Sequence, residues 1–292
     1  MIERLAVIGV GLIGGSLAKA LRAAGAVGEI IGCGRGWTNL ERALALGVID
    51  HATDDPGRAA AKADVIFIAA PLGAMHEIFA AIKGKIMPHT VITDAGSVKD
   101  SVIQDVIKVF GAIPANFVPG HPIAGTEHSG VEAALVDLYQ GRRVILTPLS
   151  HTSRKAIDLV ERIWLVSGAV VTHMEAARHD EILAATSHLP HMLAFSLVDV
   201  LARMQENDEI FKYAAGGFRD FTRIASSNPV MWRDICIANR NALQFTLQNF
   251  AQELNNLANA LNNSEGTELL KIFTRAKAAR DRYLDGISDA GE

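Results

Sequence analysis

Three glycines near the N-terminus constrain the fold of this chain more than any other feature. Gly9, Gly11 and Gly14 directly follow an apolar, strand-like run. A stretch with helical periodicity begins near Leu12 and continues through Ile13. In such a strand–turn–helix unit, the first glycine permits a tight turn, the second lets the backbone approach a pyrophosphate, and the third lets helix and strand pack closely. The pattern predicts a dinucleotide site at Gly9, Gly11, Leu12, Ile13 and Gly14, with the phosphates on the helix N-terminus. Glycines that only turn the chain are a weaker alternative.

The alternation of segments extends this prediction to a whole domain. Up to about Pro148, short β-branched runs alternate with Ala-rich helical stretches, which is typical of a parallel sheet covered by helices. After Pro148 the β-branched runs become rare and long helical patterns follow. We expect an α/β fold, with an N-terminal Rossmann-type parallel sheet over residues 1–150 and a C-terminal all-helical domain over residues 151–292.

The composition fits a globular protein with two domains. The 292 residues are 49% hydrophobic and 21% charged, with a net charge of -4. Neither half is basic, so nucleic acid is disfavoured as a partner. Cys33 and Cys236 are too few for a disulfide framework or a four-ligand zinc site. No basic leader precedes the first strand and no apolar run approaches the ~18 residues of a membrane span, so a cytoplasmic protein without membrane contact is expected.

An apolar stripe marks the last hundred residues. Leucine and phenylalanine recur there every three or four positions, as a helix face requires. The stripe comprises Leu243, Leu247, Phe250, Leu254, Leu257 and Leu261. It can pack within its own domain or form a dimer seam, because heptad-like spacing serves both.

The end of the second strand bears on the choice of cofactor. An NAD-binding fold usually places Asp or Glu about 20 residues after the glycines, on the adenosine ribose hydroxyls. This chain has Arg35 there, whose guanidinium donors suit a 2′-phosphate. NADP is therefore favoured, with NAD as the alternative if Arg35 faces solvent. Ala70 and Pro71 end a later strand, where they either line the nicotinamide ribose or merely end the strand.

A histidine in the first half is the best candidate for a general base. His121 stands between Gly120 and Pro122 on what we expect to be a strand-end loop beside the nucleotide site. Its ordinary pKa lets imidazole take a hydroxyl proton at neutral pH. Ser97, after another strand, could orient the imidazole or the substrate hydroxyl. A lone histidine is more often structural, but this setting favours chemistry.

The helical half carries two further polar groups. His188 and His191 share a helix face, and Pro190 distorts or starts the turn between them. No third ligand or carboxylate pair accompanies them, so an anionic substrate is favoured over zinc. Arg219 and Arg223 are four residues apart and could form a solvated helix face. The apolar neighbours of Arg223 predict that it is part-buried and therefore pairs with an anion such as a substrate carboxylate.

Together these segments resemble the prephenate, arogenate and cyclohexadienyl dehydrogenases of tyrosine biosynthesis. The resemblance covers nearly the whole chain, in the family's order. It rests on GVGLIGGS, DAGSVK, GHPIAGTEHSG, SHLPH, GGFRDFTRIA and NPVMWRD. It implies oxidative decarboxylation of prephenate, arogenate or both, to 4-hydroxyphenylpyruvate or tyrosine, with hydride transfer to NAD(P). Many NAD-using relatives carry an acidic residue at the GCGRG stretch, which supports NADP or dual use here.

The resemblance also implies roles for single residues. His121 would be the catalytic base on the ring hydroxyl, with Ser97 hydrogen-bonded close by. Arg223 would hold the ring carboxylate. The implied substrate-binding residues are Glu127, His188, His191, Arg223 and Trp232. A homodimer through the helical domain, which would also bind the substrate, and tyrosine as a candidate feedback inhibitor belong to the same expectation.

Two other functions compete with this interpretation. A β-hydroxyacid dehydrogenase has a similar architecture but uses a catalytic lysine in its helical half, and no such lysine stands out here. A nucleotide-sensing module without turnover is the second alternative. The presence of His121, Ser97 and Arg223 argues against it.

Overall fold

The N-terminal half forms a six-stranded parallel sheet, as the sequence predicts. The computed structural model describes residues 2–126, 128–205 and 207–288. The strand order is β3-β2-β1-β4-β5-β6, so a crossover between halves of the sheet lies beside β1, where doubly wound folds bind dinucleotides. The strands are β1 (Ile2–Ile8), β2 (Val27–Cys33), β3 (His51–Thr53), β4 (Val65–Ile68), β5 (Val91–Asp94) and β6 (Phe117–Val118).

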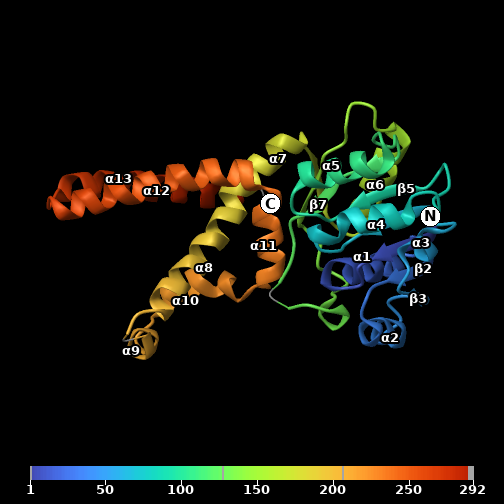
Figure 1. The fold of residues 1–292 in the computed structure, drawn as a ribbon, viewed down its shortest axis with the longest axis horizontal. Helices are drawn as coiled ribbons and strands as arrows, with labels where there is room; N and C mark the ends of the chain where they lie inside the picture. Colours follow the sequence, from blue (N-terminus) through green and yellow to red (C-terminus); the bar gives the residue numbers. More distant parts are fainter. Residues whose placement is uncertain (1, 127, 206, 289–292) are drawn as a thin grey trace. The chain divides into compact units, whose positions relative to one another are not determined.

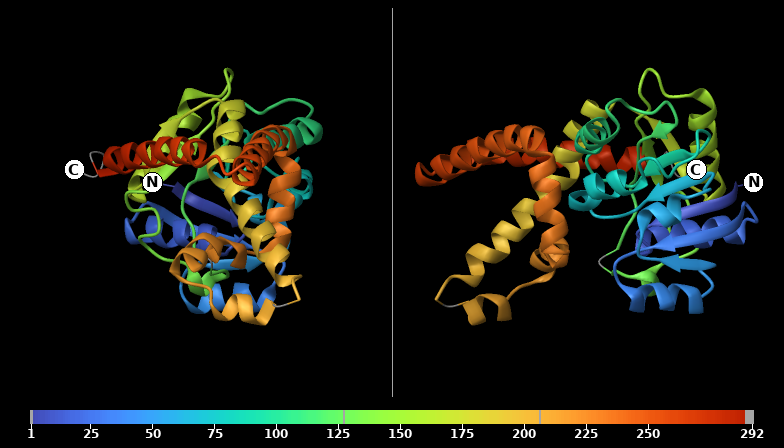
Figure 2. Two further views of the ribbon diagram at one scale, coloured as in Figure 1. Left: turned by 90° about the vertical axis from the view of Figure 1, so that its left-hand side faces the viewer. Right: turned by 45° about the vertical axis from the view of Figure 1, so that its right-hand side comes forward.

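Helices cover both faces of this sheet (Figures 1 and 2). On one face lie α1 (Leu12–Ala23), α2 (Trp37–Ala45) and α6 (Arg154–Val166), and on the other α3 (Pro56–Ala60), α4 (Met75–Ile82) and α5 (Lys99–Phe110). Because the strands are buried on both sides, their sequences are continuous apolar runs. On the α6 face, the rings of Trp164 and Phe67 meet edge to face at 5.5 Å.

A second, three-stranded sheet holds the candidate base. It consists of β7 (Gly120–Pro122), β8 (Arg143–Leu146) and β9 (Val170–His173). His121 pairs with Ile145 across the antiparallel β7–β8 ladder. The prediction of a loop at His121 is therefore wrong, because pairing with a distant strand makes a three-residue strand there. The pairing of β9 and the packing of α6 join residues 154–173 to the N-terminal elements, and the division at residue 150 stays a prediction.

The following helices lie in the same compact unit, which extends to Leu243. A nearly continuous helical stretch contains α7 (Ala176–Leu183), the π-helical η3 (Ala184–His188) and α8 (Leu189–Ala202). Pro190 lies in the first turn of α8, directly after the π-helical η3, where the backbone hydrogen bonds already depart from the regular α-helical pattern. The next elements are α9 (Asn207–Lys212), α10 (Gly216–Thr222), η4 (Arg223–Ser226) and α11 (Pro229–Ala238).

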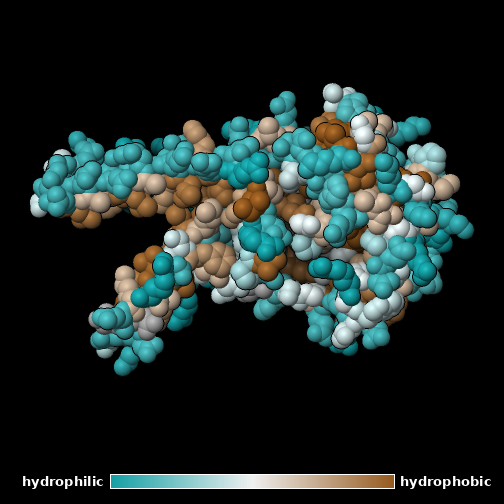
Figure 3. Space-filling model, in the orientation of Figure 1, coloured by the Kyte–Doolittle hydropathy of each residue, from teal (hydrophilic) through white to brown (hydrophobic). Residues whose placement is uncertain are grey.

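The last two helices, α12 (Arg240–Asn262) and α13 (Gly266–Ser288), leave much apolar surface uncovered. Residues 244–292 form a separate unit. Within the predicted stripe, Leu243 is buried, but Leu254 and Leu261 are exposed. Apolar side chains also lie along one flank of α12 and α13 in Figure 3, and Leu270 and Phe273 on α13 are exposed. Across the described ranges, no helix combines the length and apolarity needed to cross a bilayer.

Candidate active site

The glycine-rich turn leaves room for a dinucleotide pyrophosphate. Gly9 has φ +101°, and a Cβ there would lie 2.4 Å from the Ala69 carbonyl oxygen. A Cβ on Gly14 would lie 2.1 Å from the Gly9 carbonyl oxygen, so helix and strand approach closely. At Gly11 a Cβ would meet no atom of the described chain within 4 Å. The open space beside Gly11 adjoins the N-terminus of α1, whose first turn has no acidic residue, so these residues fit an anionic cofactor group.

The remaining predicted cofactor residues lie at the same edge of the sheet. Arg35 is exposed directly after β2, and Ala70 and Pro71 follow β4. Because β2 and β4 flank β1, these residues border the glycine-rich turn. Leu72 packs against the cluster of Val98, Trp232 and Ile235, so α11, which carries Trp232, reaches this edge.

A buried ion pair fixes the backbone next to His121. Lys99 and Asp94 are fully buried and form a salt bridge. Lys99 Nζ also donates to the Gly120 carbonyl oxygen at 2.6 Å. The Gly120 amide donates to Asp94 Oδ1 at 3.2 Å. One charged pair therefore holds both backbone groups of Gly120. Asp94 ends β5 and Lys99 begins α5, so these contacts explain why DAGSVK and GHP lie together.

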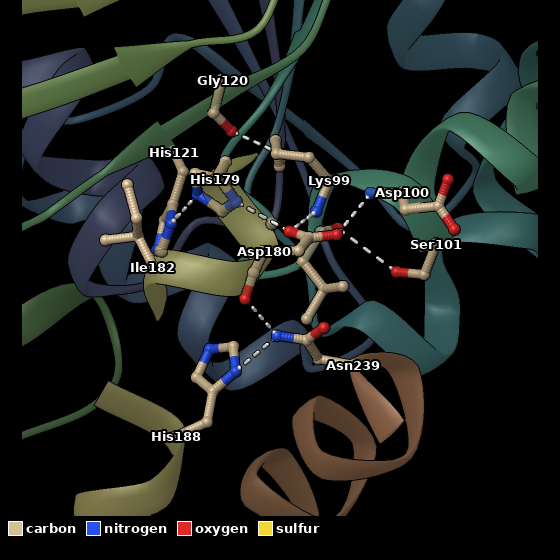
Figure 4. Close-up of polar contacts among 12 residues, drawn as sticks. Lys99, Asp100, Ser101, Gly120, His121, His179, Asp180, Ile182, His188 and Asn239 are labelled. Carbon is tan, nitrogen blue, oxygen red and sulfur yellow. Dashed lines mark hydrogen bonds and ion pairs between the residues drawn. The ribbon is translucent and has the colours of Figure 1, made fainter. Parts of the chain in front are cut away.

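A chain of polar groups runs from His121 into the protein (Figure 4). His121 Nδ1 lies 2.9 Å from His179 Nε2, and His179 Nδ1 lies 2.7 Å from Asp180 Oδ1. A carboxylate oxygen only accepts hydrogen bonds, so His179 donates to Asp180 through Nδ1. With one proton on each ring, His179 Nε2 accepts from His121 Nδ1. The lone pair of His121 is then at Nε2, where a base needs it.

The same carboxylate connects α7 to α5. Asp180 accepts from the backbone amides of Lys99 and Asp100, each at 2.8 Å. These amides belong to the first turn of α5, which has no side-chain cap of its own at Val98. A carboxylate is a favourable partner for a helix N-terminus. Asp180 therefore joins the helix carrying His179 to the segment that fixes Gly120.

The surroundings keep His121 neutral. Burial lowers its pKa well below 6.5, and the neighbouring His179, Lys99 and His188 lower it further. Because protonation is disfavoured, the basic form is present at neutral pH. His121 is only partly enclosed, so a ligand can reach the ring.

Two other predicted histidines lie together with Trp232. His191 stacks on Trp232 with ring centroids 3.6 Å apart, and His188 meets the same ring edge to face at 6.1 Å. The Trp232 indole N–H is buried and has no hydrogen-bond acceptor within the chain as described. Asn239, after α11, contacts His188 Nδ1 at 3.0 Å. These stacked rings form a flat surface, and the Trp232 N–H beside it can still donate a hydrogen bond. Such a surface is suited to binding a small ring-shaped substrate.

The remaining predicted site residues are Ser97, Arg223 and Glu127. Ser97 is half-buried before α5, and the hydrogen bonds of the described residues include none between Ser97 and His121, whose Nδ1 is occupied by His179. Arg223 is exposed, so the prediction that it is part-buried is wrong: its short η4 segment has no buried residue. Burial chiefly lowers the pKa of His191, and the charge of Arg223 lowers it further, which places Arg223 near that ring. Glu127 lies outside the described residues.

His179, Asp180 and Asn239 were not predicted from the sequence. The adjacent His-Asp pair was the available signal, since a buried carboxylate next to histidine often fixes its tautomer. On α7 the pair lies among charged residues and resembles a solvated helix face. Lys99 was part of a recognised segment, but its burial depends on Gly120, 21 residues away.

Comparison with known proteins gives consistent matches over nearly the whole chain. The family model described as "Prephenate dehydrogenase, nucleotide-binding domain" matches residues 17–173, and "Prephenate dehydrogenase, dimerization domain" matches residues 175–275. The cyclohexadienyl dehydrogenase of Zymomonas mobilis is 37% identical over 281 residues, which cover 95% of each protein.

Solved structures agree with these matches. The prephenate dehydrogenase from Aquifex aeolicus in complex with hydroxyphenyl propionate and NAD+ is 38% identical, with a TM-score of 0.88 over 96% of this chain and 98% of that chain. The Synechocystis arogenate dehydrogenase is 28% identical, with a TM-score of 0.79 over 96% of this chain and 99% of that chain.

Proposed function

The chain belongs to the prephenate dehydrogenase family, and we propose that it oxidises and decarboxylates prephenate, arogenate or both, with hydride transfer to NAD(P). The observation that carries this proposal is the chain from His121 through His179 to Asp180, because it leaves a lone pair on a neutral ring. The names of the relatives from Zymomonas mobilis and Synechocystis support a cyclohexadienol with either side chain.

The residues of the chain supply a base and a group that stabilises the positive charge that the base gains with the proton. In the proposed reaction His121 Nε2 takes the proton of the ring hydroxyl. Neutral His179 then keeps its hydrogen bond from the imidazolium, and Asp180 stabilises the positive charge, because its negative carboxylate lies at the far end of the hydrogen-bonded chain. When bound, the oxidised nicotinamide would accept the hydride from the carbinol carbon. Loss of carbon dioxide makes the ring aromatic and the reaction irreversible. The residues of the site therefore chiefly orient the substrate and complement its charge.

The predicted substrate contacts become part of this proposal. His188, His191 and Trp232 would surround the ring, and the unused indole N–H of Trp232 would donate to the ligand. Arg223 would hold the ring carboxylate, and Glu127 would lie by the side chain of the substrate. Ser97 would contact the substrate hydroxyl, which leaves His121 Nδ1 to His179.

Replacing Arg223 by alanine is expected to raise KM about ten- to a hundredfold with a small change in kcat. A carboxylate contact exists in the ground state and the transition state alike, so its loss weakens binding more than chemistry. Steady-state kinetics would measure this, with Arg219→Ala, an exposed arginine on the preceding helix, as the control. A large loss of kcat at constant KM would assign Arg223 a different role.

For the cofactor we propose NADP, with Arg35 on the 2′-phosphate. Arg35→Asp should weaken NADP use about ten- to a hundredfold, because a charge-assisted contact is lost and a carboxylate faces the phosphate. It also restores an acceptor for the ribose hydroxyls of NAD. The ratio of kcat/KM for the two cofactors measures the effect, with Arg58→Asp as the control. If the ratio in Arg35→Asp stays within about twofold of wild type, Arg35 does not contact the 2′-phosphate.

A direct assay tests the proposed function. Prephenate and arogenate are each combined with NAD and NADP, and reduced nicotinamide is followed by absorbance. We expect turnover in at least one of the combinations, and a large loss with His121→Asn. A folded protein that binds nucleotide but turns over neither substrate would instead support the nucleotide-sensing alternative.

We also propose a homodimer through the helical domain. The exposed apolar residues of α12 and α13 support it, since a monomer rarely leaves such a surface uncovered. The description of the matched model as a dimerization domain points the same way. Tyrosine as a feedback inhibitor and a cytoplasmic location remain predictions.

A further inference from the structure

Asn239 joins two groups whose hydrogen-bonding roles are constrained. It follows α11, is buried, and lies between the backbone of Asp180 and the ring of His188. Its Nδ2 donates to the Asp180 carbonyl oxygen at 2.8 Å. The same nitrogen lies 3.0 Å from His188 Nδ1. Figure 4 shows the amide between these two partners.

The chemistry of the three groups fixes the position of a proton. The Asp180 carbonyl oxygen can only accept, so the amide of Asn239 must turn its NH2 group towards it. The reverse orientation would place two oxygens against each other in a buried site. The second N–H of the same NH2 group points to His188 Nδ1, which must therefore accept. A neutral His188 then carries its single proton on Nε2.

We propose that Asn239 is a positioning residue that holds His188 as the Nε2–H tautomer, so that His188 donates a hydrogen bond to an oxygen of the substrate. The proposal rests on the proposed function, which supplies the substrate. In the view of Figure 4, Nε2 is on the side of the ring turned away from Asn239, towards His121.

The two histidines consequently have opposite roles. His121 presents a lone pair at Nε2, fixed through His179 by the carboxylate of Asp180, whereas His188 presents an N–H, fixed through Asn239 by the carbonyl of the same residue. Burial lowers the pKa of His188 to about 4, although Asp180 opposes the shift. A neutral donor binds a substrate oxygen without adding positive charge beside the base.

Nuclear magnetic resonance tests the tautomer directly. Two-bond proton–nitrogen correlations distinguish Nε2–H from Nδ1–H rings, and the His188 signals are identified by their absence in His188→Gln. In the wild-type protein we expect the Nε2–H pattern for His188 at pH 8. An Nδ1–H pattern would overturn the proposal. This readout needs no turnover, so it is independent of the proposed function.

A variant tests the consequence for binding. Asn239→Asp replaces the donor by an acceptor, so His188 should move its proton to Nδ1 and turn a lone pair towards the substrate. We expect KM to rise about ten- to a hundredfold with kcat within about threefold of wild type. Asn241→Asp, the same change at an exposed position, is the control. Unchanged KM in a folded Asn239→Asp with a reversed tautomer would show that His188 does not contact the substrate and would overturn the proposal.

Discussion

His121→Asn is expected to lower kcat by about 10²–10⁴-fold while nucleotide binding is retained, which is the contribution typical of a general base. Asparagine preserves a polar side chain of similar reach at Nδ1 but cannot take the hydroxyl proton. The structure separates the two functions, because His121 is on β7 whereas the glycine-rich turn follows β1. Steady-state kinetics and a nucleotide titration measure them independently.

His151→Asn is the matched control, since His151 is exposed and lies outside the proposed site. Its kcat should equal that of wild type. A His121→Asn enzyme with wild-type kcat would exclude His121 as the base, and one that also lost nucleotide binding would show a wider structural change.

Asp94→Leu is expected to lower the free energy of unfolding by about 3–5 kcal/mol, because it leaves Lys99 as a buried charge without its partner. The desolvation that already lowers the pKa of Lys99 would no longer be opposed by Asp94. Urea unfolding measures the change. The double variant Asp94→Leu, Lys99→Met should recover most of the loss, because an apolar pair can replace a buried ion pair at little cost.

The control for this pair is a surface ion pair on α6. Arg154 and Asp158 are in contact at 2.8 Å, one turn apart, and both are solvent-accessible. Asp158→Leu should cost no more than about 1 kcal/mol. Equal losses for Asp94→Leu and Asp158→Leu would show that burial of the Lys99 charge does not matter.

The parallel sheet was predictable because its signals are local. Each strand is a continuous apolar run, and Gly9 and Gly14 are required by contacts within one strand–turn–helix unit. The short β7 was not predictable, since it exists through pairing with β8, more than 20 residues later. The loss of β-branched runs near residue 150 also did not predict β9, because this later strand forms by pairing with β8.

The site was predictable to the extent that its residues stand in unusual local sequences. His121 is flanked by glycine and proline, and His188 and His191 flank Pro190. Each of these histidines could therefore be predicted as a site residue from its local sequence. His179 and Asp180 did not, because their burial arises where α7 meets the first turn of α5, 80 residues away in sequence. The exposure of Arg223 shows the opposite error, in which apolar neighbours in sequence were taken as neighbours in space.

We propose that this site couples oxidation of the substrate ring to its decarboxylation. The most direct measurement is the amount of carbon dioxide released for each nicotinamide reduced, in one reaction with prephenate or arogenate. We expect equal amounts throughout the reaction, with both rates falling in proportion in His121→Asn. Reduction of nicotinamide without release of carbon dioxide would contradict the account.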